Sequence, residues 1–527
     1  MKLKKILLVL TCLSSPLYAE NDQQLLQEIK RLQQQTQALQ SQLNTLQKKL
    51  VSHHTAHQPQ PKKKVRKIAK RPLVANNNKR ERVEHFHSSR VSVHAPGSHP
   101  ESIGFYPTAL VADNHVVTYI AGTPVVTSPY LGSRPAFDGS DYIVNISSIN
   151  RDIRLMQQRR KLYNAYKSIG YPAPTVPIIA LSGKAEPVGV INSPFRGNTS
   201  GDINLGSNEI AVAAALNRNV EAYVSIAYDD SPPDEGPRVN NSSFDLNLGF
   251  VNIGNLESSP FYFTAGQLYV PFGRYSSSMI SGPLPLNLAR TKTRPIILGY
   301  KSQEHTGPFA AVYVYRSDTI LGKSGVGGVN LGYIYDYREI NGEIGASFIS
   351  SIADSSGMQN NGSNVGTTFG GFGSFSNGNE AVRKTPAIDI HGNLAYDRYN
   401  LAAEWVGATE SFRPQDLSFN GRGAQPQAAQ TELDVTFRAF NRPASIGVGY
   451  QWSKDALALN LPHHRFIGVF NISIWKDTVE SIEYKHDIDY NAYQFANGAA
   501  PFGGINAPIL GTGRSGDTVS AQIGVYF

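Results

Sequence analysis

The chain has 527 residues, a formal net charge of +8, 40% hydrophobic residues and only 17% charged residues. Its single cysteine excludes a disulfide-stapled fold, and the lack of any run of about 18 apolar residues excludes a membrane-spanning helix. The length allows two or three ordinary domains or one long all-β barrel, and the 47 glycines and 26 tyrosines favour a β-rich protein.

Residues 1–19, "MKLKKILLVLTCLSSPLYA", have the composition of a bacterial signal peptide. A basic start with Lys2, Lys4 and Lys5 precedes a short apolar stretch, and Ala19 is a small residue where a signal peptidase could cut. The segment therefore predicts an exported protein. Lipidation of Cys12 is the alternative, but the preceding apolar run is short and Thr11 is bulkier than a lipobox usually carries.

Residues 20–50 predict a coiled coil, because large side chains recur at alternating spacings of four and three with glutamine and lysine between them. The seam consists of Leu25, Ile29, Leu32, Thr36, Leu39, Leu43, Leu46 and Leu50. A lone helix of this length is marginal in water, so the seam favours self-association, with a homotrimer as one outcome. The alternative is a single amphipathic helix that packs on its own domain.

Residues 51–99 form a basic, histidine-rich and proline-punctuated tract that lacks the apolar residues of a core, so we interpret it as a linker. Its charge suits an anionic neighbour such as cell-wall polymer or lipid headgroups, whereas nucleic acid does not fit an exported chain. Its histidines could bind metal weakly or belong to a polar spacer; they are His53, His54, His57, His85, His87, His94 and His99.

Residues 100–175 predict a small segment that contains one helix and lies in the periplasm or plugs a pore. In "SSINRDIRLMQQRRKLYNAYKSIGYP" the serines suit a helix N-cap, and Gly170 and Pro172 mark its end. Large side chains lie near helical spacing at Ile149, Ile153, Met156, Tyr163 and Tyr166.

From residue 176 to residue 527 the apolar pattern has a period of two, which predicts strands. We expect sixteen of them, at roughly 176–188, 200–216, 220–229, 241–253, 260–270, 292–301, 307–316, 326–338, 341–353, 385–396, 399–412, 430–440, 443–454, 464–475, 478–490 and 517–527. The connections alternate between short turns and long loops. A soluble sandwich has no reason to keep that parity, whereas a bacterial outer-membrane barrel has short periplasmic turns and long external loops.

The sequence therefore predicts a multi-pass, sixteen-stranded antiparallel β-barrel in the outer membrane, with its N-terminal region in the periplasm. Lipid cannot satisfy an open sheet edge, so the last strand, "SAQIGVYF", must pair with the first. We expect Val525 and Phe527 to face lipid. A terminal phenylalanine on an alternating strand also resembles the signal that the barrel-assembly machinery reads, which makes this machinery and outer-membrane lipid predicted partners.

A barrel of this size leaves an aqueous channel, so function should depend on the residues that narrow it. The connection "PFGRYSSSMISGPLPLNLARTKTR" carries cations and no acidic residue. The candidate pore and ligand-binding residues are Arg274, Tyr275, Arg290, Lys292 and Arg294. Three of the cations lie two residues apart, so on an extended chain they share one face, which would favour anionic solutes. The alternative is a solvated cationic rim at the membrane surface.

Two segments, "GTPVVTSPYLGSRPAFDGSDYIVNISSINRDIRLMQQR" and "GQLYVPFGRYSSSMISGPLPLNLARTKT", resemble the LbtU-type siderophore porin family. The resemblance extends from about residue 120 to Phe527, and the histidine- and lysine-rich tract before residue 100 departs from the family pattern. It implies a sixteen-stranded outer-membrane barrel that takes up an anionic ferric siderophore of the polycarboxylate kind. Iron would then be chelated cargo, with no resident metal or cofactor.

No catalytic interpretation accounts for the sequence better than a channel does. The segment "LGKSGVGG" lacks the spacing of a phosphate-binding loop, and His463 and His464 have no identifiable nucleophile or paired carboxylate beside them. We therefore expect no enzyme activity. The alternatives that remain open are an anion-selective diffusion porin and a structural protein that anchors the envelope through the coiled coil and the basic arm.

Overall fold

The computed structural model describes residues 116–120, 123–127, 150–160 except 154 and 158, and 178–526 except the gaps listed at the end of this paragraph. The predicted signal peptide, coiled coil and basic linker lie outside the described residues, as does Phe527. No helix among the described residues is long and apolar enough to cross a membrane. The gaps are 230–243, 305, 318–324, 338–339, 360–368, 370, 373–381, 397, 441, 476–477 and 499–506.

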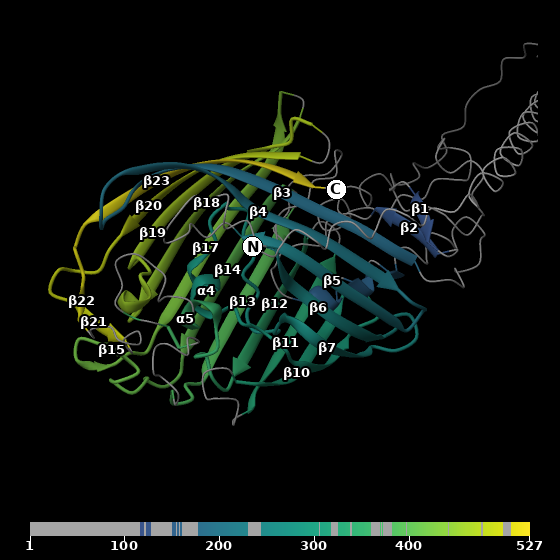
Figure 1. Cartoon of the computed structure of the whole chain (residues 1–527), viewed down its shortest axis with the longest axis horizontal. Helices are drawn as coiled ribbons and strands as arrows, with labels where there is room; N and C mark the ends of the chain where they lie inside the picture. The colour runs from purple at the N-terminus through teal and green to yellow at the C-terminus, as the bar shows by residue number, and fades with distance from the viewer. Residues whose placement is uncertain are drawn as a thin grey trace, which may run out of the picture. The chain divides into compact units, whose positions relative to one another are not determined.

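Sixteen long strands in the described part of the chain form one closed antiparallel barrel, which confirms the predicted fold (Figure 1). The strands are β3 (Ile178–Ser193), β4 (Ser200–Ala215), β5 (Val220–Asp229), β6 (Asp245–Gly254), β7 (Phe261–Tyr269), β9 (Ile296–Lys301), β10 (Gly307–Arg316), β11 (Gly325–Tyr337), β12 (Ile340–Ile349), β13 (Ala387–Tyr396), β14 (Tyr399–Ala408), β17 (Gln427–Ala439), β18 (Arg442–Lys454), β19 (His464–Ile472), β20 (Thr478–Ile488) and β23 (Ser515–Tyr526).

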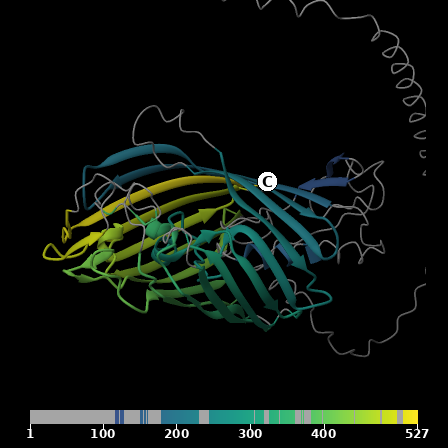
Figure 2. The same cartoon turned by 60° about the horizontal axis from the view of Figure 1, so that its bottom comes forward.

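The last strand closes the barrel against the first. Strand β23 pairs antiparallel with β3, from Asp517 opposite Ser193 to Tyr526 opposite Lys184, and it pairs with β20 on its other edge. Figure 2 shows the yellow C-terminal strands lying beside the blue N-terminal ones. Closure therefore removes the free sheet edge along the stretch of β3 that pairs with β23, and Val525 is exposed on the outer face as predicted.

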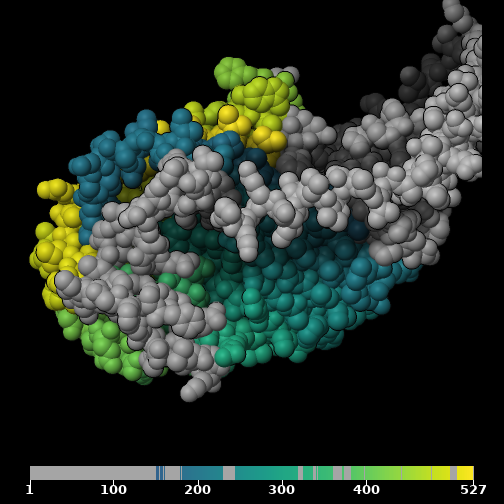
Figure 3. All heavy atoms as spheres, viewed as in Figure 1, coloured from purple at the N-terminus to yellow at the C-terminus, as the bar shows by residue number. Residues whose placement is uncertain are grey.

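The alternating sequence separates two faces. On β13, Ile388 and Ile390 are exposed, whereas Asp389 and His391 between them are buried. Because successive side chains point to opposite faces of a strand, the apolar residues cover the outside of the barrel and the polar ones line its inside. The all-atom view shows darker teal atoms set back in the middle of the molecule, below the blue atoms of the first barrel strands (Figure 3).

The long loops carry additional short elements. They contain α4 (Leu284–Ala289), β8 (Lys292–Thr293), α5 (Ser356–Gln359), β15 (Leu417–Phe419), β16 (Arg422–Gly423), η5 (Leu457–Leu459), β21 (Phe495–Gly498) and β22 (Ile509–Leu510). Strands β15, β16, β21 and β22 form a separate four-stranded sheet at the long-loop end of the barrel.

A hairpin of β1 (Val116–Ile120) and β2 (Thr123–Thr127) precedes the barrel. Strand β2 pairs in parallel with residues Ile179–Leu181 of β3, which precede Lys184, the last β3 residue that pairs with β23. The hairpin therefore covers the part of β3 that barrel closure leaves unpaired.

Candidate solute pathway in the barrel lumen

The long connection after β7, residues 270–291, folds into the barrel rather than away from it. Its side chains Phe272, Tyr275, Leu284 and Leu288 are buried. Its backbone contacts inward-facing residues of strands β12 to β20, which lie across the lumen from β7 in the strand order. We call this segment the constriction loop, because it reduces the space through which a solute can pass.

Carboxylates of the barrel wall hold the constriction loop by its backbone. Glu404 accepts hydrogen bonds from the backbone N–H groups of Arg274 and Tyr275, each at 2.7 Å. Glu432 and Glu483 accept in the same way from Ser278 at 2.6 Å and Ser281 at 2.9 Å. An irregular loop has no ladder partner for its N–H groups, so these charged acceptors supply one.

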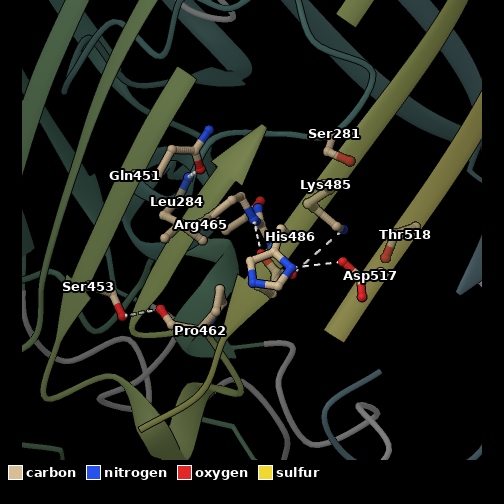
Figure 4. Close-up of polar contacts among 12 residues, drawn as sticks. Ser281, Leu284, Gln451, Ser453, Pro462, Arg465, Lys485, His486, Asp517 and Thr518 are labelled. Atoms are coloured by element: carbon tan, nitrogen blue, oxygen red, sulfur yellow. Dashed lines mark hydrogen bonds and ion pairs between the residues drawn. The ribbon is translucent and has the colours of Figure 1, made fainter. Parts of the chain in front are cut away.

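Neutral side chains of the wall complete the attachment. Gly273 N–H donates to Ser347 Oγ at 2.9 Å, and Leu284 N–H at the start of α4 donates to Gln451 Oε1 at 3.0 Å (Figure 4). Figure 4 also shows Arg465, which donates to Asp487 at 2.7 Å on the same wall and reaches Gly282 O at 3.5 Å. The loop is thus fixed along most of its length.

Two of the predicted pore residues, Arg274 and Tyr275, lie at the first attachment point. The Arg274 guanidinium contacts the Glu343 carboxylate of β12 and donates through Nε to Ser276 Oγ at 2.9 Å. Tyr275 has a left-handed backbone, with φ of 58°, and its buried hydroxyl has no hydrogen-bond partner among the described residues. Arg274 is therefore a lumen cation with a carboxylate beside it.

The other three cations do not form the expected ladder in the lumen. Arg290 caps the end of α4, and its guanidinium lies 4.6 Å from the centre of the Tyr269 ring. Lys292 and Arg294 are exposed, and their hydrogen bonds go to Asn247 at 3.2 Å and Gln267 at 3.3 Å. They alternate in step with the exposed Ile296 and Leu298 of β9. This places Lys292 and Arg294 on the outer rim, the alternative that the sequence left open.

The wall carboxylates are functional residues that the sequence analysis did not single out. Glu404, Glu432 and Glu483 all occupy inward positions, and their outward neighbours are apolar or aromatic except Thr431. That alternation could have flagged them as lumen residues. Their partners could not be read from the sequence, because the loop residues that these carboxylates bind are between 129 and 202 residues away along the chain.

The helical residues at 151–153, 155–157 and 159–160 occupy another part of the lumen. Arg159 pairs with Glu221 of β5 at 3.3 Å, and Arg151 lies 3.7 Å from Glu209 of β4. Thr264 of β7 donates to Asp152 at 3.2 Å. These partners all face inward and are buried, so this helix lies against the inner wall opposite the attachment points of the constriction loop.

The long-loop end of the barrel is covered by a hydrophobic cluster. Phe369 and Phe372 pack edge to face with ring centres 5.0 Å apart, and the ring of Phe419 lies 5.7 Å from that of Tyr490. Burial raises the pKa of Tyr490 above its usual value, and its hydroxyl lies 2.8 Å from Ser453 Oγ. The described loops therefore narrow the entrance as well as the middle of the lumen.

Carboxylates outnumber cations among the buried residues of the described barrel strands. The acidic residues are Glu186, Glu209, Glu221, Glu343, Asp389, Glu404, Glu432, Asp434 and Glu483, and the basic ones are Lys184, Lys301, His391 and Arg465. Several of these carboxylates hold the constriction loop or the helix. The wall by itself therefore does not provide a cationic path.

No family model matches the chain. A UPF0422 protein of Legionella pneumophila strain Philadelphia 1 is 71% identical over 532 residues, covering 100% of both chains. A UPF0422 protein of Coxiella burnetii is 36% identical over 406 residues, which cover 76% of this chain and 83% of that one.

Solved structures with a similar course of the chain include an anion-selective porin from Comamonas acidovorans, with a TM-score of 0.42 and 11% identity over 67% of this chain and 100% of that one. The outer membrane channel DcaP of Acinetobacter baumannii has a TM-score of 0.41 and 10% identity over 68% of this chain and 99% of that one.

Proposed function

The chain belongs to the UPF0422 family, and we propose that it is an outer-membrane channel that takes up an anionic ferric siderophore of the polycarboxylate kind. The observation that carries this proposal is the constriction loop, held across the lumen of a closed sixteen-stranded barrel. A fixed loop inside a wide barrel sets which solutes pass, because size and charge at the narrowest point decide permeation.

The outer surface supports placement in a membrane. Large apolar side chains such as Ile390 and Leu298 are exposed along the strands, which water would disfavour and lipid would favour. Exposed aromatic residues gather near the short turns, at Tyr337, Tyr396, Tyr399 and Trp475. Aromatic girdles are typical of the membrane interfaces of such barrels. With an even number of strands, the helix and the N-terminal region would lie on the periplasmic side.

The anionic class of the cargo is supported by cations at two depths. Lys292 and Arg294 are exposed at the rim, where they would attract an anion, and Arg274 lies in the constriction. The resemblance to siderophore porins supplies the polycarboxylate ligand. The buried carboxylates repel an anion less strongly than their number indicates, because Glu404, Glu432 and Glu483 accept hydrogen bonds from backbone N–H groups of the loop.

Planar-bilayer recording of the purified protein tests the proposal. We expect a small conductance that micromolar ferric citrate reduces and that citrate alone reduces less. An anion-selective diffusion porin would conduct small anions without block by the ferric chelate. A purely structural envelope anchor would show no conductance in the intact chain. Deletion of residues 20–100 also distinguishes an uptake channel from an envelope anchor, because an uptake channel should keep its conductance after the deletion.

A further inference from the structure

Three side chains with metal-binding chemistry meet on the inner wall beside the constriction loop. Asp389 and His391 lie two residues apart on β13 and therefore share its inner face. Glu404 of β14 pairs directly with His391 in the strand register. The barrel topology thus brings an imidazole and two carboxylates together, and none of them belongs to the set of pore residues predicted from the sequence.

The geometry of this cluster is compact and dry. One ligand atom from each of Asp389, His391 and Glu404 lies within 4.8 Å of the other two. The side chains of Asp389 and His391 are 0% and 1% exposed. Asp389 Oδ1 lies 2.6 Å from His391 Nδ1, which fixes the orientation of the ring. An ion bound by both residues would take the place of the proton between these two atoms, with His391 Nδ1 and an Asp389 oxygen as its ligands.

Two buried atoms of the cluster lack a hydrogen-bond partner among the described residues. They are Asp389 Oδ2 and His391 Nε2. His391 Nε2 lies 3.6 Å from Glu343 Oε1, within ion-pair distance, on the ring edge opposite Nδ1, so Asp389 Oδ2 is the unpartnered atom within the ligand set. Glu404 Oε1 accepts one N–H, from Arg274, and retains a second lone pair, whereas Oε2 accepts from both Tyr275 N–H and Gln430 Nε2. Unpartnered polar atoms at such burial are costly, and a bound ion would relieve that cost.

We propose that Asp389, His391 and Glu404 bind one divalent first-row transition-metal ion inside the barrel wall. One imidazole and two carboxylates suit ions such as Zn²⁺ or Mn²⁺. Glu343 lies outside the ligand set, because the Arg274 guanidinium already neutralises it. Metal–ligand bonds of about 2.0–2.2 Å require the three side chains to draw together slightly from their present spacing. The ion would link strands β13 and β14 to the constriction loop through Glu404.

Equilibrium dialysis of the folded, chelator-stripped full chain against Zn²⁺ tests this site. The histidine-rich N-terminal tract also binds zinc in principle, so the measured quantity is the difference between the wild type and His391→Ala in the same chain. We expect the wild type to bind one more ion per chain than this variant, and Asp389→Asn to weaken that ion's binding at least tenfold.

Glu483→Gln is the matched control, because Glu483 also holds the constriction loop by a backbone N–H but lies outside the cluster. It should keep the extra ion. Crystals soaked in Zn²⁺ should show an anomalous difference peak between the three side chains, a readout that does not depend on the N-terminal tract. Equal zinc uptake by wild type and His391→Ala, with folded barrels and no such peak, would overturn the proposal; shared protons would then hold the cluster together.

Discussion

Removal of Glu432 should loosen the constriction loop and enlarge the channel. Its carboxylate accepts from Ser278 N–H at 2.6 Å, from Ser278 Oγ at 2.9 Å and from Ser277 Oγ at 2.7 Å. Hydrogen bonds to charged groups contribute about 1.5–3 kcal/mol each, and the buried Ser278 hydroxyl can turn to Asp434 when Glu432 is removed. We therefore expect Glu432→Ala to destabilise the attached position of the loop by about 2 kcal/mol relative to a displaced position. This corresponds to roughly a 30-fold rise in the ratio of displaced to attached loop.

Single-channel recording measures this change as a larger mean conductance with frequent transitions to a higher level. Gln522→Ala is the control, because Gln522 of β23 also faces inward and makes no hydrogen bond to the loop among the described contacts. Heat-modifiable migration on a denaturing gel shows whether each variant is folded. A folded Glu432→Ala barrel with the conductance and noise of the wild type would refute the argument that wall carboxylates fix the loop.

Three further predictions follow from the barrel. Epitope tags at residue 420 or 505 should be labelled on intact cells and tags at residue 340 or 398 should not, because the former lie in long loops and the latter at short turns; labelling of the second set would reverse the topology. Deletion of Phe527, the residue after β23, should leave unfolded protein in the periplasm, since it removes the predicted assembly signal. Normal amounts of heat-modifiable barrel would contradict this. Changing Arg290, Lys292 and Arg294 to serine should shift the reversal potential away from anion selectivity. The shift should become smaller towards 1 M salt, where charges are screened over about 3 Å. An unchanged reversal potential at low salt would show that these cations do not act on the permeating solute.

The barrel could be predicted because the alternation of apolar and polar residues is visible within each strand separately. Residues such as Ile388, Asp389, Ile390 and His391 alternate regardless of their partners, and each strand repeats that pattern. The parity of turn lengths then distinguished a membrane barrel from a soluble sandwich. Closure followed from the need to pair the edge strands, and Val525 lies on the outer face as that reasoning required.

The candidate site was only partly predictable because its contacts are long-range. The sequence singled out the loop that lies in the lumen and its Arg274, but it treated residues 290–294 as one extended face. The turn "GPLPLNLA" instead forms α4, whose prolines suit a helix start, and the chain becomes extended only after Arg290. The pairing of the loop with Glu404, Glu432 and Glu483 depends on the closed barrel and leaves no local signal.

Uptake of radioactive iron into proteoliposomes tests the central claim most directly. Vesicles that contain the purified chain and an internal iron trap should accumulate iron supplied as ferric citrate faster than protein-free vesicles. Excess gallium citrate, a chelate of the same shape and charge, should compete. Iron accumulation no faster than in protein-free vesicles, from a preparation that is folded and conducts small ions, would contradict siderophore uptake and leave a diffusion porin.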